Sequence, residues 1–131
     1  MQTVMNALQL EDYAVENIVL TAAQREKSAG QATVSVTTKH FMHKEKAGHF
    51  LLKMEIRISA KGEKPVPYEM KLSVLGKFKA GKDADMKDVL ENMAPSILYG
   101  AMRDFVATLT SRSVHGKFLL PAVSFSQGKK K

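Results

Sequence analysis

The feature that most constrains the fold of this chain is a two-residue alternation of apolar and polar side chains between Ala32 and Ala80. Successive side chains of a β-strand point to opposite faces of a sheet, so the alternation predicts strands with one apolar face and one polar face. Three strands are expected, at residues 32–40, 51–59 and 68–80. Their main apolar positions are Val34, Val36, Leu52, Met54, Ile56, Ile58, Tyr68, Met70, Leu72, Val74 and Phe78. The sequence therefore predicts a sheet that is packed on one side and wet on the other.

Short connections join these strands. Segments 43–48 and 60–67 are charged and carry glycine or proline, which suits hairpin turns in an antiparallel sheet. Gly76 interrupts the last strand without changing its phase, as a bulge or a close backbone approach would. The earlier segment 13–21 is predicted to be a further strand, although its alternation is less regular.

After Gly81 the apolar spacing changes to three and four residues, the period of an α-helix. Asp83 or Asp85 is placed to cap the start of this helix. Pro95 cannot donate a backbone hydrogen bond, so the segment is either two helices or one kinked helix that ends near Arg112. The sequence thus predicts an α+β fold in which one long, proline-kinked helix packs on one face of the sheet.

The second half of this helix carries an apolar stripe that is wider than contact with one sheet requires. Pairs of neighbouring apolar residues recur every four positions, so apolar side chains extend beyond the side that faces the sheet. The stripe consists of Ile97, Leu98, Ala101, Met102, Phe105, Val106 and Leu109. Because only one long helix is predicted, we expect a second copy of the chain to cover the excess, which makes the protein a homo-oligomer.

Length and composition fit one domain without disulfides. A chain of 131 residues accommodates one core of ordinary size, and 44% of the residues are hydrophobic. We expect a single domain over residues 1–131, with an N-terminal arm at 1–12 and a disordered lysine-rich tail at 126–131. Cysteine is absent, and neither a signal peptide nor an apolar run of about 18 residues is found. A cytoplasmic location without membrane insertion is the simplest interpretation.

The chain carries 20 Lys and Arg residues against 13 Asp and Glu residues, a net charge of +7. If the strands pair as predicted, basic side chains gather on the polar face of the sheet. They are Lys39, Lys53, Arg57, Lys71, Lys77 and Lys79, accompanied by Glu55 and Glu69. A basic face attracts nucleic acid, but this one lacks the aromatic side chains on which unpaired bases stack. A basic nucleic-acid-associated structural protein is therefore only the alternative interpretation.

No pattern in the sequence predicts catalysis, a metal site or a cofactor. Three histidines, His40, His43 and His49, cluster at one hairpin. Neighbouring lysines would repel a cation there, and no acidic or cysteine ligand stands at a recognised spacing. The fourth, His115, closely follows two serines, yet no nucleophile-elbow, phosphate-loop or paired-glycine motif accompanies it. We therefore expect a protein that is not an enzyme.

The helix and the residues after it resemble the closing region of SecB proteins, a family of protein-export chaperones. The resemblance lies in MAPSILYGAMRDFVATLTSRS at 93–113 and FLLPAVSF at 118–125. The matching positions are Pro95, Ile97, Leu98, Arg103, Ser111, Arg112, Val123 and Phe125. The YAVENI segment at 13–18 and the GKF turn at 76–78 resemble the family at corresponding points of its strand order.

The resemblance implies a four-stranded antiparallel sheet with a long helix on one side. It also implies dimers that pair through the helix and the first strand and then associate as tetramers, with Tyr99 and Met102 at the helix interface. Function is implied to be that of an ATP-independent holdase, which binds unfolded polypeptide clients in a long apolar groove. The groove candidates are Val34, Val36, Phe41, Leu119, Leu120, Val123 and Phe125.

Two features depart from the family. Typical SecB proteins are acidic, and their polar sheet face meets a basic tail of the SecA motor, whereas the same face here leans basic. Like charges would oppose docking of SecA. After Phe125 only SQGKKK follows, so the C-terminal helix of many relatives is not expected. A specialised role, such as guarding an antitoxin, fits these departures as well as general export does.

Overall fold

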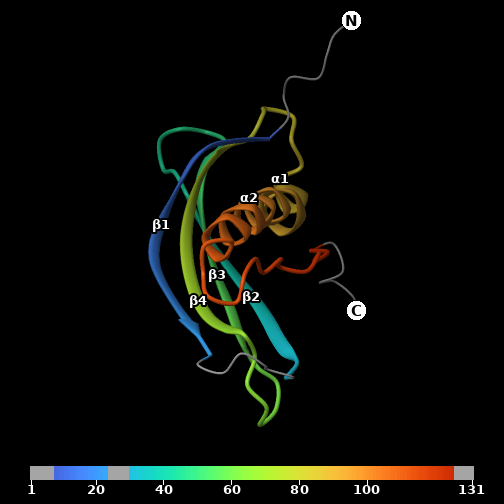
Figure 1. Ribbon diagram of the computed structural model, residues 1–131. Helices are drawn as coiled ribbons and strands as arrows, with labels where there is room; N and C mark the ends of the chain where they lie inside the picture. The colour runs from blue at the N-terminus through green and yellow to red at the C-terminus, as the bar shows by residue number, and fades with distance from the viewer. Residues whose placement is uncertain (1–7, 24–29, 126–131) are drawn as a thin grey trace, which may run out of the picture.

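The computed structural model describes residues 8–23 and 30–125 and shows a sheet covered on one side by a helix (Figure 1). The strands are β1 (Gln9–Ala22), β2 (Ala32–Met42), β3 (His49–Ala60) and β4 (Tyr68–Lys79). They lie in the order β1-β4-β3-β2, and each neighbouring pair is antiparallel. Strands β1 and β2 therefore form the two edges. This confirms the predicted α+β fold with a four-stranded antiparallel sheet.

The alternation read from the sequence sets the two faces of the sheet. In β3 and β4 the even-numbered side chains are buried beneath the helix, and Ile56 lies opposite Leu72 on one side and Val36 on the other. The odd-numbered side chains point away from the helix, and we call this side the outer face. Since the side-chain period of a strand is two, any slip of register would exchange the two sets.

Strand β1 is where the alternation was least regular, and two register shifts explain it. One lies between Leu10 and Asp12 and the other between Val15 and Asn17, each adding a residue opposite β4. A β-bulge of this kind inverts the odd-even phase of the strand that carries it. The strand also begins at Gln9, so the second part of the expected arm at 1–12 belongs to the sheet. Residues 1–7 and the expected tail at 126–131 lie outside the described residues.

One continuous helical segment follows the sheet, made of α1 (Met86–Asp88), a π-helical turn η1 (Val89–Met93) and α2 (Ala94–Thr110). The side chain of Asp85 accepts from the Asp88 N–H and caps the start. In the π turn the Ala94 N–H bonds to the Val89 carbonyl, five residues back, just before Pro95. Of the two predicted alternatives, the single helix is the one observed. No helix in the described part of the chain is long and apolar enough to cross a membrane.

The core lies between α2 and the helix side of β3 and β4. Leu98, Met102 and Val106 are fully buried there, and the rings of Phe50 and Phe78 stack with centroids 5.3 Å apart. A Cβ atom at Gly76 would lie 3.1 Å from a methyl carbon of Leu98 and 3.0 Å from the Phe78 ring. The strand glycine noted in the sequence thus lets the helix approach the sheet.

Candidate functional site

The chain after α2 turns back at residues 111–115 and then runs along the helix in an irregular path; we call residues 113–125 the strap (Figure 1). Three side chains of α2 bind its backbone. The Tyr99 hydroxyl donates to the Pro121 carbonyl at 2.7 Å, and Arg103 Nε donates to the Leu120 carbonyl at 3.1 Å. The hydroxyl of Thr110 accepts from the Phe118 N–H at 2.8 Å. The helix therefore holds an extended polypeptide by its main chain.

Apolar side chains anchor the strap as well. Leu120 is 1% exposed and belongs to the core, while Phe118 and Phe125 are half-buried against it. The Phe125 ring meets the Tyr99 ring edge-on at 5.9 Å. Burial raises the pKa of the Tyr99 hydroxyl above its ordinary value of 10.0, and the nearby charge of Arg103 only partly offsets this rise.

The seven groove candidates do not form one surface. Val34 and Val36 are half-buried on the helix side of β2, opposite Ile58 and Ile56, and pack against the same core as the strap. On the strap, Leu119 is 64% exposed and Val123 is also exposed, whereas Phe125 is half-buried. Two candidates lie elsewhere. Leu120 is part of the core, and Phe41 points from β2 to the outer face, opposite Leu51.

The predicted oligomer contact, which comprises the helix stripe and Tyr99, divides into two sets. Leu98, Tyr99, Met102 and Val106 are buried within the chain itself, so they are not available to a second copy. Ile97, 38% exposed, leads a second set with the half-buried Ala101, Phe105 and Leu109 at spacings of four. Each residue of an α-helix is rotated by about 100° around the helix axis, so residues two positions apart lie on nearly opposite sides. Ile97 and Ala101 therefore face away from the strap, which Tyr99 and Arg103 hold.

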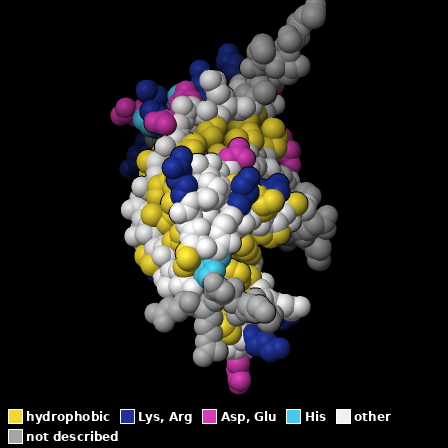
Figure 2. Space-filling view, viewed as in Figure 1, with side chains coloured by type: hydrophobic (Ala, Val, Ile, Leu, Met, Phe, Trp, Pro, Cys, Tyr) yellow, Lys and Arg dark blue, Asp and Glu magenta, His cyan; other side chains and the backbone are white. Residues whose placement is uncertain are grey.

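We call Met93 and the set of Ile97, Ala101, Phe105 and Leu109 the open flank of α2. Met93 and Tyr13 are exposed apolar residues that were not predicted as site residues. Met93 stands four residues before Ile97 and is exposed on the same stripe. Tyr13 is exposed on β1, paired with Gly76 on the helix side of the sheet, and α2 contacts β1. Met93 could have been identified from the sequence, because it stands four residues before Ile97 at the spacing of the stripe. Hydrophobic side chains reach the surface in several places around the helix layer (Figure 2).

The six predicted basic residues all lie on the outer face of the sheet. Lys39 stands directly opposite Lys53, and Arg57 directly opposite Lys71. Lys77 and Lys79 follow on β4 with the same orientation. Like charges directly opposite one another destabilise a sheet. Lys53 forms an ion pair with Glu16 at 3.8 Å, and His49 Nδ1 lies 3.9 Å from a carboxylate oxygen of Glu11.

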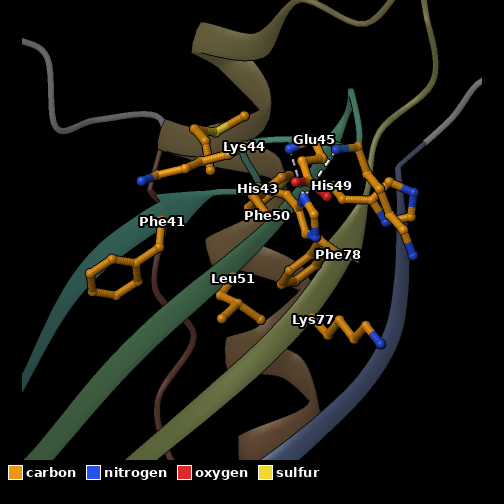
Figure 3. Close-up of a pocket in the computed structure, with 11 residues that line it drawn as sticks. Phe41, His43, Lys44, Glu45, His49, Phe50, Leu51, Lys77 and Phe78 are labelled. Atoms are coloured by element: carbon orange, nitrogen blue, oxygen red, sulfur yellow. Dashed lines mark hydrogen bonds between the residues drawn. The ribbon is translucent and has the colours of Figure 1, made fainter.

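A pocket of about 500 Å³ opens at the end of the β2–β3 hairpin (Figure 3). Phe41, Leu51 and Lys77 line it from three neighbouring strands, and the turn at 43–46 forms its rim. His43 orders that turn, because its Nδ1 accepts from the backbone N–H groups of Glu45 and Lys46, each at 3.0 Å.

Two of the four histidines, His43 and His115, make hydrogen bonds with the backbone. His40 lies on the helix side of β2, whereas the rings of His43 and His49 are 6.4 Å apart at the hairpin. Among the residues that the structure describes, no three His, Cys, Asp or Glu side chains are grouped to hold a metal ion. His115 Nε2 lies 2.6 Å from the Ala23 carbonyl, and its ring packs edge-on against Tyr68. The hydroxyls of the two nearby serines donate to helix carbonyls.

Comparison with known proteins identifies relatives of this fold. The family model described as "Preprotein translocase subunit SecB" matches residues 1–128. The structure is similar to a SecB-like chaperone from Mycobacterium tuberculosis in complex with a ChAD peptide from the HigA1 antitoxin, with a TM-score of 0.71 and 11% identity. That match covers 90% of this chain and 91% of the other.

A protein of unknown function from Streptococcus agalactiae has a similar fold, with a TM-score of 0.53 and 12% identity. The match covers 91% of this chain and 100% of that chain. No curated protein matches the sequence. At such low identities the structural likeness concerns the fold alone.

Proposed function

Because the chain belongs to the SecB family, we propose that it is an ATP-independent chaperone that holds unfolded polypeptide chains in an extended form. Membership of this family supports a chaperone role. Holding a client in this way requires a surface that binds many sequences, and such binding relies on apolar contacts and on the backbone that all clients share.

The observation that carries the proposal is the way the chain binds its own strap. Tyr99 and Arg103 donate to carbonyl groups, which every polypeptide presents regardless of sequence. Leu120 meanwhile places one apolar side chain in the core. The helix side of this fold thus accommodates an extended segment through main-chain hydrogen bonds and spaced apolar contacts, the two interactions that a holdase requires.

We assign client binding to the apolar residues that remain accessible beside the strap. They are Val34, Val36, Leu119, Val123 and Phe125. Strand β2 is an edge, so its second side has no neighbour among the described strands. The related chaperone from Mycobacterium tuberculosis holds a peptide from an antitoxin, which supports a polypeptide as the ligand of this fold.

Suppression of aggregation tests this assignment. The protein is expected to delay light scattering when a chemically unfolded client is diluted into buffer. Replacing Leu119 and Val123 together by serine should raise the concentration needed for half-suppression about tenfold, since their apolar contacts with the client are lost. Val114→Ser is the matched control, because Val114 is exposed and precedes the strap anchors. A wild-type chain that leaves aggregation unchanged would contradict the proposal.

We further propose that the protein works as a homo-oligomer, a dimer that pairs again into a tetramer. The open flank of α2, from Met93 through Ile97, Ala101 and Phe105, offers an apolar stripe beside the edge strand β1. A stripe of this kind suits a two-fold contact in which each copy covers the other. Assembly would also join the client surfaces of several copies into a longer track.

Two cellular uses fit such a holdase, which would act in the cytoplasm. It can keep proteins unfolded before export, or it can guard a particular client such as an antitoxin. The basic outer face opposes docking of a basic motor tail such as that of SecA. Co-purification with the wild-type chain separates the two uses: SecA should be recovered if the protein serves export, and one particular client should be recovered if the protein guards that client.

A further inference from the structure

The outer face of the sheet carries a small apolar cluster that the core does not need. Phe41 is 47% exposed and Leu51 is 37% exposed, and they lie directly opposite each other on β2 and β3. Leu75 stands two residues before Lys77, the partner of Leu51 on β4, and is half-buried. Diagonal neighbours on one sheet face are within reach of each other. We call Phe41, Leu51 and Leu75 the outer cluster.

The outer cluster borders the hairpin pocket, so part of it is recessed. Phe41 and Leu51 line that pocket together with Lys77 (Figure 3). The rim at 43–46 is ordered by the two hydrogen bonds to His43 and carries Lys44 and Lys46 on either side of Glu45. A preformed pocket with an apolar wall and a charged rim suits one anchor side chain surrounded by ionic contacts.

Three lysines lie next to the outer cluster, and acids stand beside two of them: Asp12 of β1 is the cross-strand partner of Lys77, and Glu16 pairs with Lys53. Lys39 is two residues from Phe41, Lys53 is the partner of Leu75, and Lys77 is the partner of Leu51. In the described part of the chain Lys53 pairs with Glu16, and no ion pair involves Lys39 or Lys77. Lys39 and Lys53 face each other directly, an arrangement that costs stability in the free protein. A bound anion would remove that cost.

We propose that the outer cluster and its three lysines bind an acidic segment of another protein, with one apolar side chain of the partner in the pocket and its carboxylates on the lysines. A second copy is disfavoured, because a two-fold contact through this face would set lysines against lysines. Phe41 is the only aromatic side chain of the outer cluster, so nucleic acid would find too few rings for stacking.

The inference is independent of client holding, which we place on the opposite side of the sheet. It predicts that the site can be lost while the chaperone activity remains. Lys39→Glu and Phe41→Ser should therefore leave aggregation suppression as in the wild type. Conversely, the serine variant of Leu119 and Val123 should leave binding of the acidic segment unchanged.

Fluorescence anisotropy with the full chain tests the proposal. The probe is a short labelled peptide that carries a Leu-Phe pair between runs of aspartate and glutamate, and it should bind with an affinity that falls as salt is added. A peptide with lysine in place of the acids should not bind. Lys39→Glu and Phe41→Ser should each weaken binding of the acidic probe by about tenfold or more. Lys87→Glu, the same charge change on exposed α1, should alter it less than about twofold.

A stability measurement separates a binding role from a structural one. Lys39→Glu places an acid opposite Lys53 and should raise the urea midpoint while it weakens binding. Two outcomes would overturn the proposal. One is binding of the acidic probe that survives both Lys39→Glu and Phe41→Ser. The other is tighter binding of single-stranded DNA, or of vesicles containing phosphatidylglycerol, that these same variants abolish.

Discussion

The hydroxyl group of Tyr99 donates a 2.7 Å hydrogen bond to the backbone carbonyl of Pro121 and so ties the strap to the middle of α2. The bond needs the proton of the hydroxyl, and burial favours the neutral form, which raises the pKa of Tyr99 above 10.0. Folding and attachment of the strap are therefore favoured when the Tyr99 hydroxyl is protonated.

This linkage predicts a loss of stability at high pH. A hydroxyl whose pKa is higher in the folded than in the unfolded chain stabilises the fold fully at pH values below its unfolded pKa of 10.0. This stabilisation is lost as the pH rises through the folded pKa. Tyr99→Phe should reduce the free energy of unfolding by about 1 kcal/mol at neutral pH, since a hydrogen bond is lost. The gap between the two proteins should narrow above pH 10.0 in urea titrations. A gap that widens there would contradict the assignment.

Leu120 and Leu119 are adjacent but differ in burial, which gives a sharp test of the strap. Leu120→Ala should lower the free energy of unfolding by about 3 kcal/mol, because it leaves a cavity in the core. Leu119→Ala should change it by less than about 0.5 kcal/mol, as exposed substitutions do. Urea unfolding followed by circular dichroism measures both. Equal effects would mean that the strap does not pack as described.

Gly76 sets how closely the helix approaches the sheet. Gly76→Ala should destabilise the fold by about 1–2 kcal/mol, because the added methyl would press on Leu98 and Phe78, both fully buried. Gly62 provides the control, since a Cβ there meets no atom within 4 Å. Gly62→Ala should be neutral or should stabilise by up to about 1 kcal/mol. Thermal unfolding of the two variants distinguishes a packing role from a general intolerance of alanine.

A charge introduced on the open flank of α2 should change the number of copies in the assembly without changing the fold. Ile97→Asp should convert the proposed oligomer to monomers, because a charge would be buried at the contact between copies. Ser96→Asp adds the same charge at an exposed neighbouring position of the helix and should leave assembly intact. Native mass spectrometry reads the number of copies directly. A wild-type chain that is already monomeric would remove the basis for the helix contact.

The fold was largely accessible from the sequence because its strands keep strict alternation. Residues in β2, β3 and β4 fall on the expected faces, and Asp85 caps the helix as one of two candidates. Strand β1 was harder to define, because its two bulges break the odd-even phase that a pattern search relies on. The π turn before Pro95 allowed a single helix where local rules also permitted two.

The site was less accessible, because it depends on how distant segments meet. Apolar character alone could not tell that Leu120 enters the core while Leu119 stays out, since an extended strap has no regular period. Phe41 was grouped with Val34 and Val36, although its odd position places it on the outer face. The wide helix stripe was predicted to lie between copies, but Leu98, Met102 and Val106 are buried within the same chain.

The strap also has a consequence for how such a protein changes over generations. Its hydrogen bonds from Tyr99 and Arg103 end on carbonyl groups, which a mutation in the strap does not remove. Substitutions at exposed strap positions such as Leu119 can therefore accumulate while the path of the segment stays fixed. The side chains of the proposed client surface can then change along the strap, while the helix keeps the strap backbone in one position.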